Sequence, residues 1–332
     1  LAHNVVLTTI CDYVPCLLQT LHEAADMNDT AVTQLMRFQT PIKAVLSMLP
    51  CLLFLYVNAV MLFALLSKPV LLESPRYILF GHLLIADSLQ LIMVVLLYIF
   101  AVTMVRMISY VCIIITLFAV FTFKISPLNL AVMSLERYVA ICFPLRHANI
   151  VTTRLTGVAI AVMWAVASLD SFIQLLVLFS LENSGYTVSG FCHRHFLQLR
   201  IYSTMNKTFT IVLFVLVSII IIYTFIAIMI TVKSASSTAT ARNARKAYKT
   251  VLLHLLQLFL CLASTLFNMI NSNSLWNMNP VMALHIQYVL FLGVIIFPKC
   301  LSPLIYGLRD HTFRHVFKNY FTFGLKKTFP MS

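Results

Sequence analysis

Seven long apolar runs constrain this chain more than any other feature of its sequence. Each run reaches the roughly 20 residues that a helix needs to cross the hydrocarbon core of a bilayer. Backbone groups in lipid must satisfy their own hydrogen bonds, and no alternating barrel pattern is present, so the runs are predicted to be helices. They lie near residues 43–67, 77–103, 111–137, 155–180, 205–232, 250–271 and 282–306.

Composition agrees with a membrane protein. Hydrophobic residues make up 61% of the 332 residues and charged residues only 10%, with a mean hydropathy of +0.95. A soluble domain carries about 25% charged residues. The expected fold class is therefore an all-α membrane protein, a seven-transmembrane helix bundle in contact with lipid. The net charge of +13 is attributed to loops facing one side of the membrane, and no nucleic acid is expected as a partner.

The distribution of basic residues predicts the orientation. Cytoplasmic loops carry an excess of Lys and Arg. With the N-terminus outside, 15 of the 23 basic residues fall on the inner side and six on the outer side, while Lys124 and Lys299 lie within runs. The sequon at Asn28 agrees, because it lies in the predicted external tail and is a candidate glycosylation site.

These patterns divide the chain into three segments. Residues 1–41 are expected to form an extracellular tail and residues 42–308 the transmembrane bundle. Residues 309–332 are expected to form a short amphipathic eighth helix and a cytoplasmic tail, because Phe313, Phe317 and Phe321 share a face. Such a helix lies on the membrane surface.

Short polar motifs recur within the runs in a fixed order. Asn58 and Asp87 lie in the first two runs, and Glu136-Arg137-Tyr138 closes the third. They are followed by Trp164, by Tyr223 and by "SPLIY", which ends the seventh run at Tyr306. In this order and spacing, residues 42–321 resemble the rhodopsin-like (class A) G-protein-coupled receptors.

A narrower resemblance is carried by three longer stretches. "MSLERYVAICFPLRH" (133–147), "RKAYKTVLLHL" (245–255) and "SPLIYGLRD" (302–310) are similar to signatures of the odorant (olfactory) receptor family, in variants typical of fish odorant receptors. Three features depart from the common pattern. Glu136 replaces the more usual Asp, Ser302 stands where many receptors have Asn or Asp, and the second external loop carries only Cys192.

The resemblance implies a function and several partners. It implies a receptor, not an enzyme, that binds a small odorant and activates a heterotrimeric G protein of the olfactory Gs type. It implies a multi-pass protein of the plasma membrane of olfactory-neuron cilia, without a cofactor. It also implies a disulfide between Cys112 and Cys192, because Cys112 precedes Arg137 by 25 residues.

Other functions remain open at this point. A non-olfactory class A chemosensory receptor fits the same motifs. A transporter or channel would favour several membrane acids along a path, broken helices and internal repeats. This sequence shows no repeat, and Asp87 and Asp170 alone make a poor ion route. Lys299 lies on the helix where a retinal pump forms its Schiff base, but the motifs favour a receptor. No Cys/His spacing indicates a metal site.

The Glu136-Arg137-Tyr138 triplet is interpreted as a switch. By resemblance, Arg137 pairs with Glu136 at rest and turns toward Tyr223 and the G protein on activation, while Tyr306 marks the seventh helix at the same end. A charge whose partners exchange between two states is a bistable element that a ligand can bias. The alternative is an interfacial arginine that only extends its head group to water.

Charges within the runs are expensive in lipid and are functional candidates. In the family fold Lys299 lies beside Asp87, with Ser126 close by, so Lys299 is expected to replace a sodium ion as the partner of Asp87. Lys124 and Asp170 are expected at similar depth on neighbouring helices. They form a structural bridge, or Lys124 binds the carboxylate or sulfate of a ligand, and both hold if an anionic ligand competes with Asp170.

A stripe of side chains is predicted to line the ligand site. Thr116, Ala119, Val120 and Phe123 share one helical face above Lys124. By family position they should look into the bundle together with Thr265, Met269, Tyr288 and Leu292. Ala119 stands near the position where amine receptors place an aspartate, so an amine held in that way is not expected. Plain helix packing is the alternative for each residue.

Overall fold

The computed structural model describes residues 30–67, 69–102, 106–180, 189–191 and 200–234, together with residues 252 and 256. Apart from residues 252 and 256, the predicted sixth, seventh and eighth helices lie outside the described residues, as does the tail before residue 30. The elements, in chain order, are α3 (Thr30–Leu66), α4 (Pro69–Leu72), α5 (Pro75–Val102), β1 (Arg106–Ile108), α6 (Ser109–Cys142), α7 (His147–Ile150), α8 (Thr153–Ser180), β2 (Ser189–Phe191) and α9 (Arg200–Ser234).

Five helices in the described part of the chain are long and apolar enough to cross a membrane. They correspond to the first five predicted runs. Their spans are Met48–Leu66, Pro75–Leu97, Ile114–Cys142, Thr153–Leu176 and Thr208–Thr231. The helix α3 itself begins at Thr30, well before the first apolar run. The helix extends beyond the hydrophobic residues by which that run was identified.

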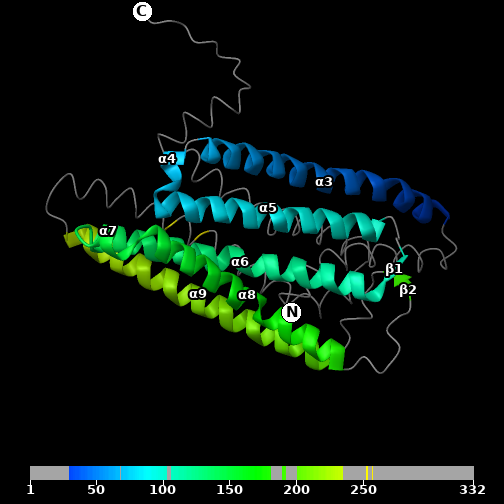
Figure 1. Ribbon diagram of the computed structural model, residues 1–332. Helices are drawn as coiled ribbons and strands as arrows, with labels where there is room; N and C mark the ends of the chain where they lie inside the picture. The colour runs from blue at the N-terminus through cyan, green and yellow to red at the C-terminus, as the bar shows by residue number, and fades with distance from the viewer. Residues whose placement is uncertain are drawn as a thin grey trace, which may run out of the picture.

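The long helices run alongside one another as a bundle (Figure 1). The helix α6 contacts α5, α8 and α9, while α3 packs mainly on α5. The strands β1 and β2 pair antiparallel, with Arg106 opposite Phe191, at the end where α5 stops and α6 begins. We call this the strand end. The opposite end, where α4 and α7 lie, is called the α7 end.

Among the described residues, the larger apolar core joins all five long helices near the α7 half of the bundle, with Met163 as the buried contribution of α8. It includes Met61 and Leu65 of α3, Leu83 of α5, Leu130 of α6 and Ile221 of α9. Close approach of α3 to α5 requires a glycine. A Cβ atom added to Gly81 would lie 2.8 Å from the Leu65 Cδ2 atom, closer than packed carbon atoms approach.

A small polar network ties α5, α6 and α8 together. The Trp164 Nε1–H donates to His82 Nε2 at 2.8 Å, and the Asn129 amide donates to the Leu79 carbonyl at 3.0 Å. The Trp164 ring also packs on Phe121, with centroids 5.1 Å apart. Buried Trp normally finds a hydrogen-bond acceptor, and here that bond fixes the spacing of α8 relative to α5.

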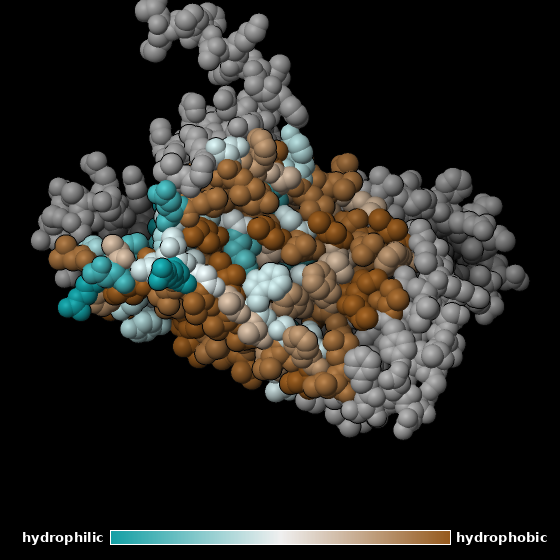
Figure 2. All heavy atoms as spheres, in the orientation of Figure 1, coloured by the Kyte–Doolittle hydropathy of each residue, from teal (hydrophilic) through white to brown (hydrophobic). Residues whose placement is uncertain are grey.

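Among the described residues, the face of the bundle that Figure 2 shows is largely apolar. Large side chains point outward along α3, α8 and α9, among them Leu53, Val158, Leu176, Val212 and Ile219. Hydrophilic residues gather instead at the α7 end, in the region where Figure 1 places α7. A largely apolar face with a polar end is the kind of surface that a bilayer requires.

Candidate functional site

The triplet predicted as a switch lies near the C-terminal end of α6, at the α7 end of the bundle. The Arg137 Nε atom lies 3.0 Å from Glu136 Oε2, so the two adjacent side chains form an ion pair. Glu136 is buried, whereas Arg137 is partly exposed. A carboxylate held in this position competes with any other partner for the arginine.

A third residue reaches the same carboxylate. The chain turns at Phe143–Arg146, with the Arg146 N–H donating to the Phe143 carbonyl at 3.1 Å, and the turn leads into α7. His147 Nε2 then lies 3.6 Å from Glu136 Oε1, which is longer than a hydrogen bond. When His147 is protonated, the two groups form a second ion pair on Glu136.

Tyr138 and Tyr223 make an aromatic contact between α6 and α9. Their ring centroids lie 5.9 Å apart, and the Tyr138 ring also meets Phe143 edge-on at 5.8 Å. Tyr223 is 58% exposed. The structure therefore places Tyr223 against Tyr138, while Arg137 is paired with Glu136. Tyr306, the remaining predicted member of this group, lies outside the described residues.

The turn before α7 presents two apolar side chains, Phe143 and Leu145, to its surroundings. Leu145 is 96% exposed and lies between the switch triplet and His147 in the chain. Exposed Arg146 follows it directly, and exposed Arg154 begins α8. An apolar tip beside basic residues is a contact surface that the folded chain itself leaves uncovered.

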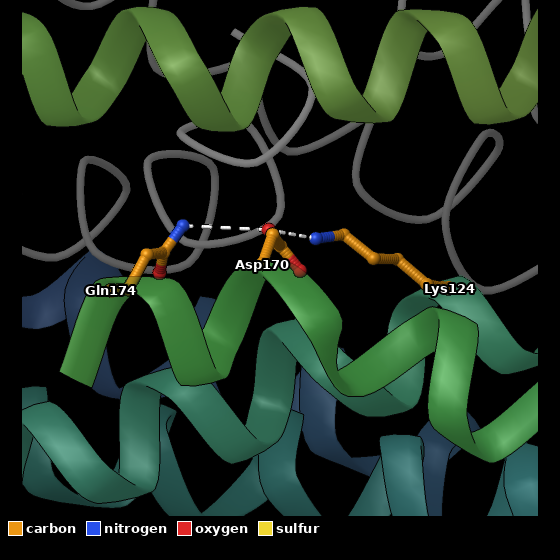
Figure 3. Close-up of polar contacts among 3 residues, drawn as sticks. All are labelled: Lys124, Asp170 and Gln174. Carbon is orange, nitrogen blue, oxygen red and sulfur yellow. Dashed lines mark hydrogen bonds and ion pairs between the residues drawn. The ribbon is translucent and has the colours of Figure 1, made fainter. Parts of the chain in front are cut away.

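Lys124 of α6 and Asp170 of α8 meet inside the bundle. The Lys124 ammonium donates to Asp170 Oδ2, and Lys124 is 0% exposed. The Gln174 amide, one turn further along α8, donates to the same oxygen at 3.4 Å. In Figure 3 the carboxylate lies between the ammonium and the amide. The structure thus brings together the two charges that the sequence placed on neighbouring helices.

A ring from a third helix covers this cluster. The Lys124 Nζ atom lies 5.1 Å from the centroid of Phe209 on α9. A cation at this distance over an aromatic face is attracted by the ring quadrupole. We name the four residues Lys124, Asp170, Gln174 and Phe209 the charged cluster. It joins α6, α8 and α9 and is shielded from solvent.

Asp87 lies fully buried on α5. The Ser126 hydroxyl of α6 donates to Asp87 Oδ1 at 2.7 Å, which agrees with the predicted proximity of these two residues. Asn58 of α3 is equally buried. Lys299, the predicted partner of Asp87, lies outside the described residues.

The predicted ligand stripe is buried on α6. Thr116, Ala119 and Val120 are all at least nine-tenths buried. Phe123 is partly buried and packs on Phe214 of α9, with centroids 6.1 Å apart. These four residues therefore face protein and not lipid. The four residues predicted opposite them (Thr265, Met269, Tyr288 and Leu292) lie outside the described residues.

The strands β1 and β2 each lie close in the chain to one cysteine of the predicted disulfide. Antiparallel pairing holds Ser189–Phe191 against Arg106–Ile108, and β1 leads directly into α6, which carries Cys112 near its start. Cys192 follows β2 in the chain and lies outside the described residues, as does Asn28.

Sequence reasoning missed three members of these sites. Gln174 follows Asp170 by four residues, so helical spacing alone was a usable signal. His147 is brought to Glu136 only by the turn before α7, and Phe209 only by the rotation of α9. In the described part of the chain, no group of three His, Cys, Asp or Glu residues could hold a metal ion.

Comparison with known proteins agrees with the arrangement of helices and motifs. Residues 57–306 match the family described as 7 transmembrane receptor (rhodopsin family). Odorant receptor 131-2 of Danio rerio is 33% identical over 295 residues, which cover 82% of this chain and 84% of the relative. Olfactory receptor 2M5 of Homo sapiens is 30% identical over 187 residues, covering 54% of this chain and 58% of that protein.

The chain therefore belongs to the rhodopsin family of seven-transmembrane receptors. It is a G-protein-coupled receptor with odorant-receptor relatives, and it is a receptor and not an enzyme. Membership implies a small-molecule ligand, a G protein as partner and a place in the plasma membrane as a multi-pass protein. The class A and odorant-receptor resemblance inferred from the motifs is confirmed.

Proposed function

We propose that this receptor detects a small odorant in the strand-end half of the bundle and signals through an olfactory Gs-type protein from the ciliary membrane of sensory neurons. The relatives named odorant or olfactory receptors support the ligand class. The observation that carries the signalling step is the ion pair of Glu136 with Arg137 at 3.0 Å, because it is the contact that must open.

The strand end faces outward in this proposal, and the α7 end faces the cytoplasm. The bias of basic residues toward the inner segments supports this orientation. It places Asn28 outside for glycosylation and residues 309–332, with the amphipathic eighth helix, inside. The pairing of β1 with β2 supports a Cys112–Cys192 disulfide, since it holds the loop that leads to Cys192 near the start of α6.

The ligand is proposed to contact the buried stripe and the charged cluster. Thr116, Ala119, Val120 and Phe123 supply apolar and hydroxyl surface on α6. Thr265, Met269, Tyr288 and Leu292 are proposed to complete the site from the sixth and seventh helices. Lys124 of the charged cluster directly follows Phe123 on α6. A ligand at these residues therefore contacts the same helix that carries the Glu136-Arg137-Tyr138 triplet near its C-terminal end.

Activation is proposed to exchange partners at the cytoplasmic end. Arg137 leaves Glu136, and Tyr223 leaves Tyr138 and turns inward toward Arg137. Tyr306 acts at the same end of the seventh helix. The exposed Leu145, flanked by Arg146, offers the G protein an apolar contact beside this opening. The Glu136–Arg137 and Tyr138–Tyr223 contacts are both made in the resting receptor and lost in the active one.

Cyclic AMP in cells that express the receptor with an olfactory-type Gs protein tests the proposal. Glu136→Gln removes the charge that holds Arg137, so we expect basal cyclic AMP to rise without any ligand. Glu136→Gln combined with Arg137→Ala is the matched control and should remain silent. A surface-expressed Glu136→Gln variant that produces no cyclic AMP with Gs would contradict the Gs assignment.

A further inference from the structure

Two buried oxygen atoms of the charged cluster carry no hydrogen bond. Asp170 Oδ2 accepts from both Lys124 and Gln174. Asp170 Oδ1 and Gln174 Oε1 have no hydrogen-bond partner among the residues that the structure describes. Both side chains are more than nine-tenths buried. Most buried polar atoms are hydrogen-bonded, so two such oxygens one turn apart on α8 require an explanation.

The identity of the atoms decides what could satisfy them. A carboxylate oxygen and an amide oxygen are both acceptors. The Gln174 amide cannot rotate to offer its nitrogen elsewhere without losing its bond to Asp170. A group that fills these positions must therefore present N–H or O–H donors. A carboxylate, ester or ether offers only acceptors and leaves both oxygens unsatisfied.

The charges of Lys124 and Asp170 further limit which ligand groups the charged cluster can bind. The positive charge of Lys124 already neutralises Asp170 inside the bundle. An ammonium ligand would add an uncompensated positive charge to this buried place, and an anion would have to draw Lys124 away from Asp170. Burying an unpaired charge is costly. An uncharged donor satisfies the oxygens and leaves the ion pair intact.

We propose that the charged cluster is the polar recognition site for an uncharged ligand group that donates hydrogen bonds, such as a primary carboxamide or a hydroxyl. Asp170 Oδ1 and Gln174 Oε1 accept the donors, Lys124 holds the Asp170 carboxylate in place through Oδ2, and the Phe209 ring closes the α9 side. The proposal rests on the proposed function in one respect, that ligands enter this half of the bundle. It assigns Lys124 a role other than that of an anion receptor.

A chain-matched panel of small molecules tests this specificity. Primary amides and alcohols of four, six and eight carbons are compared with the N,N-dimethyl amides, methyl ethers, carboxylates and amines of the same chains. The readout is cyclic AMP in cells with equal surface receptor. We expect primary amides or alcohols to act at concentrations roughly ten-fold or more below those of their methylated counterparts, as the loss of a buried hydrogen bond predicts.

Two glutamine variants separate the cluster from a general effect of polarity. Gln174→Met removes one of the two open acceptors, the amide oxygen, but leaves Asp170 Oδ1 and the ion pair, so it should reduce the preference for donors. Gln90→Met removes an equally buried amide on α5, outside the cluster, and should preserve that preference. Loss of the preference in Gln90→Met, or an unchanged preference in Gln174→Met, would overturn the proposal.

The remaining outcomes are equally decisive. Preference for carboxylates or for the methylated compounds would contradict the donor requirement. Failure of every amide and alcohol would also contradict it. The basal cyclic AMP of Glu136→Gln needs no ligand, so a positive result there combined with such a failure would overturn the ligand assignment and leave Gs coupling intact.

Discussion

Lys124 and Asp170 form a buried ion pair that links the middle of α6 to α8. Two charges removed from water lose hydration that their mutual attraction only partly replaces. The pair is therefore a poor source of stability by comparison with apolar packing, although each partner depends strongly on the other. The loss of stability on removing one partner should therefore differ from the loss on removing both, and this difference can be measured.

Removal of one partner should destabilise the receptor more than removal of both. Asp170→Leu leaves the buried Lys124 charge without its carboxylate partner, which typically costs about 3–5 kcal/mol, so we expect a much lower Tm of the detergent-solubilised receptor. The double variant Lys124→Met with Asp170→Leu should recover most of that loss. Ser168→Ala, which changes a side chain on the same helix outside the cluster, is the control. Additive losses in the double variant would show that the charges do not interact.

The close contact of α3 with α5 gives a second prediction. Gly81→Val places methyl groups where the Leu65 side chain lies, since even a Cβ would be 2.8 Å from Leu65 Cδ2. Overpacking of this kind costs about 1–3 kcal/mol, and the Tm should fall. Gly157→Ala is the matched control, because nothing lies within 4 Å of its added Cβ.

Rescue identifies the cause. Leu65→Ala should recover part of the Tm lost in Gly81→Val, because it empties the space that the valine needs. If Gly81→Val and Gly157→Ala have the same Tm, the close approach of α3 to α5 is wrong.

Trp164 provides a test of the polar network. Trp164→Phe keeps a ring that can pack on Phe121 but removes the Nε1–H that donates to His82. A part-buried acceptor that loses its donor costs up to about 1–3 kcal/mol, the penalty of a fully buried one. We expect a lower Tm for Trp164→Phe than for the parent receptor. His82→Leu in the same background should give no further loss, whereas independent roles of the two residues would make their losses add.

The charged residues of the spans could be foreseen from the sequence because lipid makes them conspicuous. Lys124, Asp170 and Asp87 each interrupt a long apolar run, and an isolated charge there requires a partner. Asp170 and Lys124 were the charges within reach on adjacent helices. Adjacent Glu136 and Arg137 could be paired by inspection.

The face of α9 that contacts α6 could not be predicted from the sequence, because the apolar span of α9 contains no conspicuous charge. The span Thr208–Thr231 has a mean hydropathy of 3.1, so it is apolar on every side and gives no signal for the face that meets α6. Nothing in the sequence distinguishes Phe209 from its neighbours. The contact of His147 with Glu136 depends on the turn before α7, which lies outside the long helices. The hydropathy of the sequence does not predict the conformation of such a turn.

Sodium provides a prediction for Asp87 and Lys299. If the Lys299 ammonium is the partner of Asp87, exchange of sodium for N-methylglucamine at constant ionic strength should not alter the basal cyclic AMP of Glu136→Gln membranes. Lys299→Ala should introduce sodium dependence, because the ion can then replace the ammonium. Lys299→Arg keeps the charge and serves as the control. Sodium dependence in the receptor with Lys299 present would exclude this pairing.

His147 is expected to restrain the switch through Glu136. It lies 3.6 Å from Glu136 Oε1, while Arg137 holds Oε2 at 3.0 Å. His147→Arg supplies a permanent charge that holds the carboxylate in place, and His147→Ala removes that restraint. We expect His147→Ala to raise basal cyclic AMP and His147→Arg to leave it at or below the parent level, in cells with equal surface expression. Arg146→Ala changes the exposed neighbouring charge and should not raise basal signalling. A rise in Arg146→Ala equal to that in His147→Ala would attribute the effect to the charge of the whole loop and not to the contact with Glu136.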